Sequence, residues 1–435
     1  GSGLECDKFN PDAVRLQFDS WFGEAVRRLG RERARRVIKL FHVDSWECGS
    51  QNWSSIFRQE FMARRGYDLV KFLPVMAGIP LESADLSERV LYDIRRTITE
   101  LTTDNFFGVM QRQAHANGCL FSAECVAPVM MSDGMLHYKY TDLPMGEFWF
   151  QSKTHDKPND ILDAVSGARV YGKNIVQAEA FTQRRIYWNE HPAMLKALQD
   201  TEFALGVNRM VFHVYTHSPW LNRVPGMTLN DGIGLFLGRN QTWWKPGRMW
   251  VEYTTRCQAL LQYGSAVADI AVFTGEALPS RAILPEKLVP FLPGLFGKDV
   301  VAREYERSGN RGVPMVDGAA GRPQSATITD ALDWSNALRG YHYDCLNPDA
   351  LLHRTRIENG RIIMVDGRSY GALVVPGYHA MQPDPGYMSE AVAAKLREML
   401  LAGVPVLIGN IPEQSLGIES LGTNFAWPDS AAFIR

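Results

Sequence analysis

Apolar and polar residues alternate in blocks along the first 270 residues, in the order typical of βα units. A short apolar or β-branched run comes first, then a polar or aromatic cluster, and then an amphipathic helical pattern. Parallel strands that are buried on both faces are continuous apolar runs, and most of these runs have that character. The pattern predicts strands over residues 36–43, 120–123, 175–178, 209–214 and 267–273.

Amphipathic patterns predict the helices of the same region. Apolar residues recur every three to four positions from Asp85 to Ala116, which predicts one long helix. Residues 12–29 are also helical in pattern, and Leu4-Glu5-Cys6 before them looks like the tail of another unit. About five candidate strands precede Tyr263, too few to close an eight-stranded barrel. Either further strands are hidden in apparent loops, or the chain begins part-way through the barrel.

The pattern changes after Gly264. Proline and glycine accumulate in an irregular connection over residues 274–327. Beyond it we expect helices at 330–338 and 389–401 and short buried strands at 362–365, 372–375 and 404–408. The predicted fold class is therefore α/β: a (β/α) TIM-type barrel over residues 1–263 that lacks its N-terminal strands, followed by a flavodoxin-like three-layer domain over residues 264–435, with 267–273 as its first strand.

Composition removes several classes of function. The chain has 46 Lys and Arg against 48 Asp and Glu, a net charge of −2, which argues against binding to nucleic-acid phosphates. We see no apolar run of the roughly 18 residues that a membrane span needs, and no Gly-x-Gly-x-x-Gly or phosphate loop that would indicate nucleotide binding. The six cysteines contain no Cys-x-x-Cys pair and are interpreted as buried thiols.

Three predicted strands have a glutamate at or just past their C-terminal end: Glu47, Glu124 and Glu179. The carboxyl ends of barrel strands form one rim, so these side chains are expected to meet in one cleft. Cleavage of a glycosidic bond needs a carboxylic acid for the leaving oxygen and a second carboxylate that activates water or attacks carbon. A structural ion pair or helix cap is the alternative for each glutamate. Glu47 and Glu179 are the sharpest candidates, and Glu124 could equally bind a metal or sugar hydroxyls.

Aromatic residues and histidines accompany the glutamates. Tryptophans fall in the predicted βα loops, where a flat ring suits the apolar face of a sugar, although tryptophan also anchors loops in large cores. Glu147 is expected in a long loop, and His213 and His217 follow a strand, a setting that favours hydrogen bonding over a helical zinc motif. The candidate substrate contacts are Asp44, Trp46, Asn52, Trp53, Glu124, Glu147, His213, His217, Trp243 and Trp244.

Several sequence blocks, in order, resemble glycoside hydrolase family 106, which comprises α-L-rhamnosidases. The blocks are Gly3-Leu4-Glu5-Cys6-Asp7-Lys8, His42 to Glu47 with Gln51-Asn52-Trp53, Phe61 to Asp68, Asp142 to Trp149, Ala178 to Thr182, His213 to Pro219, Pro225 to Thr228 and Asn240 to Trp244. Residues 346–412 resemble the flavodoxin-like domain that follows the barrel in such enzymes.

The resemblance implies an inverting hydrolase with Ca²⁺ in the active site contacting the rhamnose hydroxyls. Glu47 would be the general acid and Glu179 the general base. Glu124 is the candidate that would replace either of them if its assignment is wrong. Inversion would place the two carboxyl groups about 6.5 to 9.5 Å apart. The partner would be a carbohydrate, in a periplasmic or secreted location. A β-galactosidase-like glycosidase and a carbohydrate-binding fragment without turnover are the two alternatives. Oligomeric state stays open.

Overall fold

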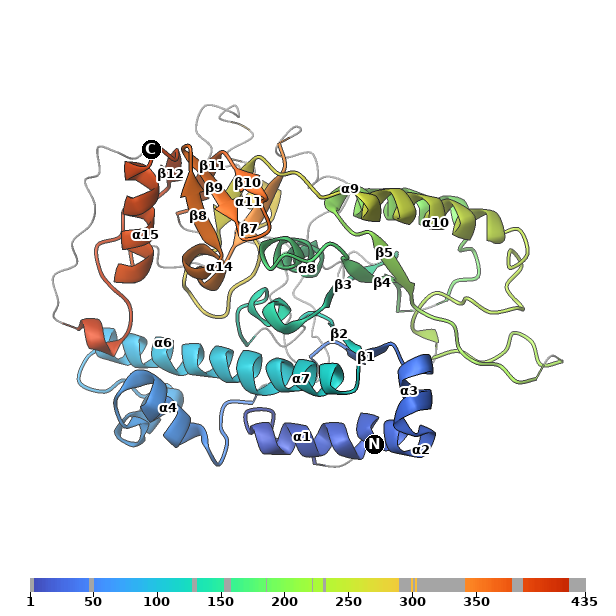
Figure 1. Cartoon of the computed structure of the whole chain (residues 1–435), viewed down its shortest axis with the longest axis horizontal. Helices are drawn as coiled ribbons and strands as arrows, with labels where there is room; N and C mark the ends of the chain where they lie inside the picture. The colour runs from blue at the N-terminus through green and yellow to red at the C-terminus, as the bar shows by residue number, and fades with distance from the viewer. Residues whose placement is uncertain are drawn as a thin grey trace.

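The computed structural model describes residues 4–46, 51–126, 131–151, 158–184, 186–220, 222–229, 232–288, 299, 302, 341–377 and 386–421. Its largest sheet has five parallel strands in the order β1-β2-β3-β4-β5, curled as half of a barrel (Figure 1). Sequential order is what repeated βα units produce, because each crossover returns the chain beside the previous strand. The strands are β1 (Leu40–Val43), β2 (Leu120–Ala123), β3 (Leu143–Trp149), β4 (Gln177–Thr182) and β5 (Arg209–Phe212).

Helices cover the outer side of this sheet. In Figure 1 a long helical run lies below the strands, and α9 and α10 lie above β4 and β5 at the upper right. The helices of this part are α1 (Pro11–Ser20), α2 (Phe22–Leu29), α3 (Arg31–Val37), α4 (Phe57–Arg65), α5 (Leu73–Met76), α6 (Ala84–Leu101), α7 (Gly108–Ala116), α8 (Pro158–Val170), α9 (Pro192–Leu205) and α10 (Arg248–Tyr263), with shorter turns η1 (Leu69–Phe72) and η3 (Leu136–Tyr140).

The predicted helix over 85–116 is confirmed, with one irregularity. A π-helical segment, η2 (Thr102–Phe107), joins α6 to α7 and directs Phe106 and Phe107 into the core. The helical stretch at 12–29 is broken at Trp21, between α1 and α2. Residues 4–6, interpreted from the sequence as the tail of a βα unit, form no strand.

β3 was expected as a loop, and that prediction was wrong. Its sequence, LPMGEFW, contains a proline and a glycine, which are usually rare in strand interiors. Helix α8 explains the glycine: a Cβ on Gly146 would lie 2.7 Å from the carbonyl oxygen of Asp160, so only glycine allows the helix to pack this closely on β3. β3 is therefore a barrel strand that the sequence pattern left hidden in an apparent loop.

A second parallel sheet follows, with the order β12-β11-β6-β7. Its strands are β6 (Ile270–Phe273), β7 (Tyr343–Leu346), β11 (Ala372–Val375) and β12 (Val406–Ile408). The predicted strand at 362–365 does not belong to it. That run forms β9 (Arg361–Met364) of a separate antiparallel sheet with β8 (Thr355–Glu358) and β10 (Ser369–Tyr370), because a short turn at 359–360 folds it back on β8.

Helices α14 (Pro348–His353) and α15 (Glu390–Leu401) accompany the second sheet, with the short elements α11 (Pro285–Leu288) and η7 (Ile418–Ser420). The predicted helix at 389–401 is confirmed. The predicted helix at 330–338 and most of the irregular connection at 274–327 lie outside the described residues. Among the described residues, no helix is long and apolar enough to cross a membrane.

A buried ion cluster joins the two sheets. Arg281, in the segment after β6, donates to the carboxylates of Asp160 and Asp163 on α8, and all three residues are at most 5% exposed. The backbone N–H of Ala282 also donates to Asp163, over 2.6 Å. Burial raises the pKa of Asp163 to about 6, and the charge of Arg281 opposes that rise. Removing the guanidinium would leave two buried carboxylates without the cation that pairs with them.

A buried histidine lies beneath the carboxyl end of β2. His137 is 1% exposed, packs against the ring of Phe107, and its Nε2 lies 2.9 Å from the carbonyl oxygen of Glu124. Because a carbonyl can only accept, Nε2 carries the hydrogen of a neutral ring. Burial lowers the pKa of His137 to about 3, which the hydrogen bond to the Glu124 carbonyl opposes.

We predict that Arg281→Met lowers the free energy of unfolding by about 3 to 5 kcal/mol, because it leaves buried charges without a partner. The matched control is Arg248→Met, whose partner Glu252 lies 2.7 Å away on the exposed face of α10. That change should cost less than about 1 kcal/mol. Urea unfolding of both variants measures the difference. Equal costs would show that the Arg281 cluster does not join the sheets as described.

Because His137 is buried with a lowered pKa, we predict that the free energy of unfolding falls as the pH is lowered. Its folded pKa is depressed, so below the unfolded pKa of about 6.5 only the unfolded chain gains the proton. Stability should therefore fall between pH 6.5 and pH 4 by roughly 1.4 kcal/mol per unit more in the wild type than in His137→Gln. Urea unfolding across this range is the measurement, with exposed His353→Gln as control. Parallel pH profiles for wild type and His137→Gln would contradict the assignment.

Candidate active site

The register of the five strands places one polar residue from each strand on the same face of the sheet. His42 is paired with Ser122, and Glu147 of β3 is paired with Glu179 of β4, which in turn is paired with Val211 of β5. Side chains two residues apart in a strand point the same way. Asp44 follows His42 by two positions, Glu124 follows Ser122 by two, and His213 follows Val211 by two. The ends of the strands therefore direct Asp44, Glu124, Glu147, Glu179 and His213 toward a shared space.

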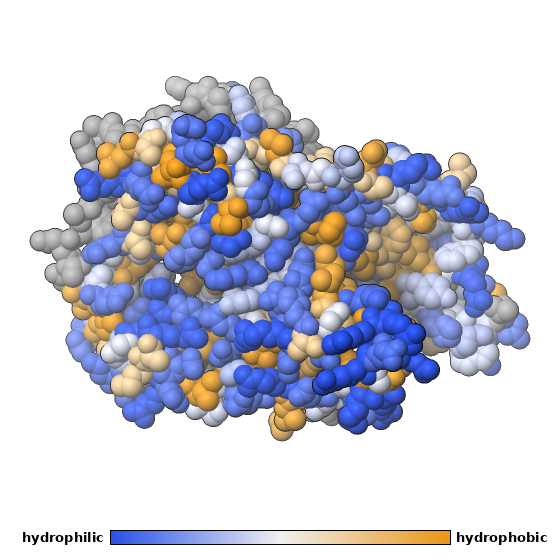
Figure 2. Space-filling view, viewed as in Figure 1, coloured by the Kyte–Doolittle hydropathy of each residue, from blue (hydrophilic) through white to orange (hydrophobic). Residues whose placement is uncertain are grey.

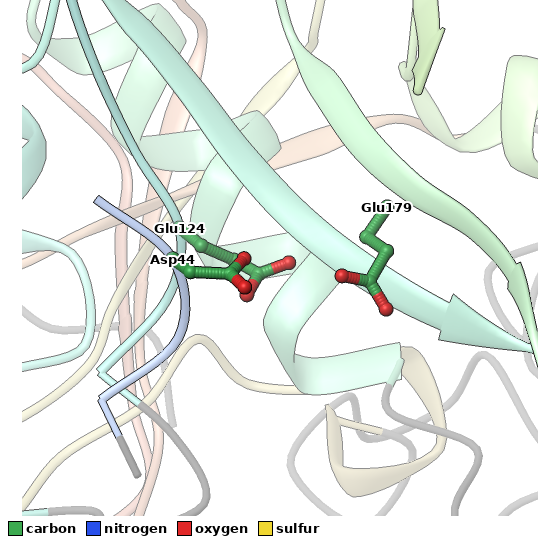
Figure 3. Close-up of side chains that lie close together, drawn as sticks. All are labelled: Asp44, Glu124 and Glu179. Carbon is green, nitrogen blue, oxygen red and sulfur yellow. The ribbon is translucent and has the colours of Figure 1, made fainter. Parts of the chain in front are cut away.

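Three of these acids meet. One carboxylate oxygen from each of Asp44, Glu124 and Glu179 lies within 4.8 Å of the other two. Figure 3 shows Asp44 and Glu124 side by side, with the carboxylate of Glu179 turned toward them from β4, on the far side of β3. Glu124 is 1% exposed, whereas Asp44 is open to solvent. The site thus has a buried carboxylate at its base and an accessible one at its edge.

The charge of Asp44 is stabilised from one side by His42. The hydrogen bond between them, 3.4 Å from Nε2 to Oδ1, lowers the pKa of Asp44; burial opposes this, and the positive potential of His42 and an interaction with Glu124 add to the lowering. Asp44 is consequently ionised throughout the neutral range and supplies a fixed negative charge to the cluster.

A layer of hydrogen bonds supports the acids from below. The Nδ1 of His42 lies 3.1 Å from the hydroxyl of Ser122, and that hydroxyl lies 2.9 Å from the amide oxygen of Gln177. Ser122 also reaches the carbonyl of Leu143, at 3.0 Å. These contacts join β1, β2, β3 and β4 directly under the carboxylates, so they hold the strands in the register on which the site depends.

Glu179 is oriented by two neighbours. The hydroxyl of Thr182 donates to its Oε1, and the Nδ1 of His213 lies 3.7 Å from the same oxygen. Burial lowers the pKa of His213, which the charge of Asp44 opposes, so the imidazole is neutral at pH 7. Gly234 packs against the His213 ring. A Cβ at this position would lie 2.7 Å from Nδ1, and the φ of Gly234, +86°, also favours glycine.

Glu147 is a fourth acid on this face, and it is buried. It lies in β3 rather than in the predicted loop, and the indole N–H of Trp149 donates to its Oε1 over 2.5 Å. Its strand register sets it beside Glu179. Glu147 therefore lies on the same face as Glu179, in a strand where the sequence predicted a loop, and its contact with substrate stays a prediction.

The other predicted contacts differ in how far they are exposed. Glu47, the proposed general acid, lies outside the described residues, and its separation from Glu179 stays untested. Trp46 is 7% exposed and packs edge-on against Phe106, so its ring belongs to the core, which was one of the two alternatives for it. Asn52, Trp53, His217 and Trp244 are exposed, and Trp243 is half-buried with its N–H donated to the Glu190 carbonyl.

Sequence reasoning missed the residues that support the acids: His42, Ser122, Gln177 and Thr182. The sequence nevertheless contains a pattern from which three of them could have been predicted. His42, Ser122 and Gln177 each stand two positions before a predicted or actual acid, and in a strand that spacing places both side chains on one face. Three polar residues at the same offset from three acids would have predicted a polar layer beneath them.

Comparison with known proteins gives a consistent result. The family model of glycoside hydrolase 106, described as α-L-rhamnosidase, matches residues 1–306. A curated relative from Formosa agariphila, named a putative beta-glucuronidase, is 36% identical over 318 residues, which are 72% of this chain and 27% of that protein. The chain thus spans about a quarter of the length of that relative.

Solved structures extend the likeness to the fold. The rhamnosidase from Novosphingobium sp. PP1Y has a TM-score of 0.74 and 28% identity, over 95% of this chain and 35% of that one. The β-galactosidases from Rahnella sp. R3 and Marinomonas ef1 have TM-scores of 0.52 and 0.50 at 14% and 11% identity, covering 92% and 94% of this chain and 54% and 60% of theirs. At that identity they show a shared fold alone. The chain belongs to glycoside hydrolase family 106.

Proposed function

We propose that this chain carries the catalytic half-barrel of an α-L-rhamnosidase that hydrolyses terminal α-L-rhamnosides with inversion at the anomeric carbon. The observation that carries the proposal is the convergence of Asp44, Glu124 and Glu179 from three strands at one end of the sheet. Among the described residues, histidines contact Asp44 and Glu179, and one of them, His213, is neutral at pH 7. Carboxylates gathered in this way suit a polar substrate or a cation.

Single displacement assigns one role to each acid. Glu179 would accept the proton of the attacking water, because it is ionisable, fixed by Thr182 and set on a rigid strand. Glu47 would protonate the leaving oxygen, an assignment that rests on its place in the Asp-Ser-Trp-Glu block. Glu147 beside Glu179 would bind sugar hydroxyls. The proposed architecture is a TIM-type barrel of which this chain supplies part, followed by a flavodoxin-like domain that begins at β6.

The carboxylates also fit the Ca²⁺ that the family implies. Oxygen donors are the ligands this hard cation prefers, and ligand distances of about 2.3 to 2.6 Å allow oxygens up to roughly 5 Å apart to share one ion. The oxygens here lie within 4.8 Å of one another. Asp44 and Glu124 would hold the ion, with Glu179 within reach. When bound, Ca²⁺ would orient rhamnose by coordinating its hydroxyls.

Product analysis by NMR tests the proposed reaction. The first sugar released from an aryl α-L-rhamnoside should be the β-anomer. Glu179→Gln should lower kcat by about 10²- to 10⁴-fold, because water then lacks its base. Glu47→Gln should slow an alkyl rhamnoside more than an aryl one, since a good leaving group needs little protonation. Glu252→Gln, on exposed α10, is the matched control.

Three results would contradict this reaction. Release of the α-anomer first would mean retention, and faster cleavage of an aryl β-galactoside would favour the β-galactosidase-like alternative. Rhamnose binding without turnover, unaffected by Glu179→Gln, would favour a carbohydrate-binding protein.

Calorimetric titration with Ca²⁺ after treatment with a chelator tests the cation. We expect Glu124→Gln to weaken binding by about tenfold or more, because a neutral amide replaces a buried anionic ligand. Glu252→Gln again serves as the control. If Glu124→Gln binds Ca²⁺ as the wild type does, the ion is held elsewhere.

A further inference from the structure

A hollow of about 660 Å³ lies between helix α6 and the second sheet. Its volume falls within the roughly 300 to 1,000 Å³ of small-molecule sites. The described residues that line it do not include Asp44, Glu124 or Glu179, so it is separate from the candidate active site. In Figure 1 its walls lie at the left, with α6 below and α14 and α15 above, and strands β1 to β5 lie further right.

The topology of the second sheet places this hollow where open α/β sheets bind their ligands. The chain passes from β6 to β7 on one side and later forms β11 on the other side, so the strand order reverses at β6. Ligands bind at the carboxyl ends of the strands beside such a point. Here the turn after β6, residues 275–278, and the start of α14, residues 348–349, both line the hollow.

The segment that carries η7 also lines the hollow, and two residues of α6 hold it in place. Arg89 is buried, and its guanidinium donates to the carbonyl of Ser415 over 2.6 Å and to the hydroxyl of Ser420 over 2.8 Å. Asp93, one turn further along α6, accepts the N–H of Ile418 over 3.1 Å. Because these bonds fix the segment to the helix, the hollow is preformed.

The acids inside the hollow are largely compensated. Glu100 pairs with two arginines of α4 and with Arg96 of α6. Asp349 lies 2.9 Å from the Nζ of Lys139. Burial raises the pKa of Asp133 to about 7, so this carboxyl is close to half protonated at neutral pH. The interior is therefore near charge balance, which favours an uncharged ligand.

Two hydrogen-bond donors of α6 line the hollow without a partner among the described residues. One is the hydroxyl of Tyr92, which keeps its proton because burial, together with the charge of Glu276, raises its pKa. The other is the end of Arg96, since only its Nε is bonded, 3.1 Å from Oε1 of Glu100. The buried carboxylate of Glu276 accepts the N–H of Ser389 over 2.7 Å and adds an acceptor to the same lining.

Apolar side chains complete the lining: Leu136, Leu278, Leu352 and Leu416. A sugar ring matches this mixture, because its hydroxyls both donate and accept while its C–H faces are apolar. In Figure 2 the surface over these elements is mostly blue with scattered orange. A site for a protein partner would present a broad apolar patch there instead.

We propose that this hollow is a second binding site, for an uncharged mono- or disaccharide, separate from the site of cleavage. Neighbouring hydroxyls of the sugar accept from the terminal nitrogens of Arg96 and donate to the carboxylate of Glu276, and the leucines contact its C–H faces. Glu390 and Glu419, exposed at the edge, repel anions. Because α6 and the second sheet both form its walls, a bound sugar stabilises their contact.

Methyl NMR of leucine-labelled protein tests this site directly, because four leucines line it. L-rhamnose, D-galactose, D-glucose and lactose are titrated one at a time, and the four leucine signals are assigned by Leu→Met substitutions. We expect at least one sugar to shift these signals to saturation. Arg96→Gln should then raise its Kd by about tenfold, which corresponds to one charge-assisted hydrogen bond. Arg95→Gln, exposed on the same helix and outside the lining, is the matched control.

Tyr92→Phe is the second variant, and it should raise the Kd by about threefold to tenfold. It decides the outcome if Arg96→Gln does not fold, because no described residue bonds to the Tyr92 hydroxyl.

Two kinds of result overturn the proposal. One is that none of the four sugars shifts the leucine signals, or that the Kd is the same in wild type, Arg96→Gln and Tyr92→Phe. The other is that inorganic phosphate or spermidine shifts the signals and the sugars do not, because the ligand would then be charged. These titrations involve no turnover, so failure to cleave an aryl α-L-rhamnoside would count against the proposed function alone.

Discussion

The structure depends above all on the register of five parallel strands. Parallel pairing fixes which residues stand beside one another, and the two-residue period of a strand fixes which of them face the same side. A shift of β2 by one residue would turn Glu124 and Ser122 to the helix side together and would send their apolar neighbours into the cleft. Each functional side chain is therefore positioned by backbone hydrogen bonds along a whole strand rather than by its own contacts.

This arrangement has an electrostatic cost. Carboxylates whose oxygens lie within 4.8 Å repel one another, more so where one of them is buried as Glu124 is. The contacts of His42 with Asp44 and of Thr182 with Glu179 offset part of that repulsion, and a bound cation or polyol would offset more. The site therefore favours binding of a cation or a polyol, because either would reduce the repulsion between the carboxylates.

Sequence patterns predicted the parts that depend on local periodicity. Apolar runs identified β1, β2, β4 and β5, and the acids that follow the runs of β2 and β4 predicted that Glu124 and Glu179 would share a rim. β3 was not predicted as a strand because it contains Pro144 and Gly146, which are rare in strand interiors. Only the structure shows that α8 packs so closely on β3 that Gly146 is required. The assignment of residues 362–365 to the wrong sheet has a similar cause, since a buried run alone cannot tell a parallel partner from an antiparallel one. Trp46 shows the same limit for function: an aromatic residue beside an acid can equally anchor the core.

The claim on which the rest depends is that acids from separate strands interact across one space, and a double-mutant cycle on folding stability tests it without assuming any activity. In chelator, Glu124→Gln and Glu179→Gln should each raise the free energy of unfolding, because each removes one partner of a repulsive pair. The double variant should then gain less than the sum of the two, by about 0.5 to 3 kcal/mol. If the two effects add within about 0.5 kcal/mol, the carboxylates do not meet, and the site described here does not exist.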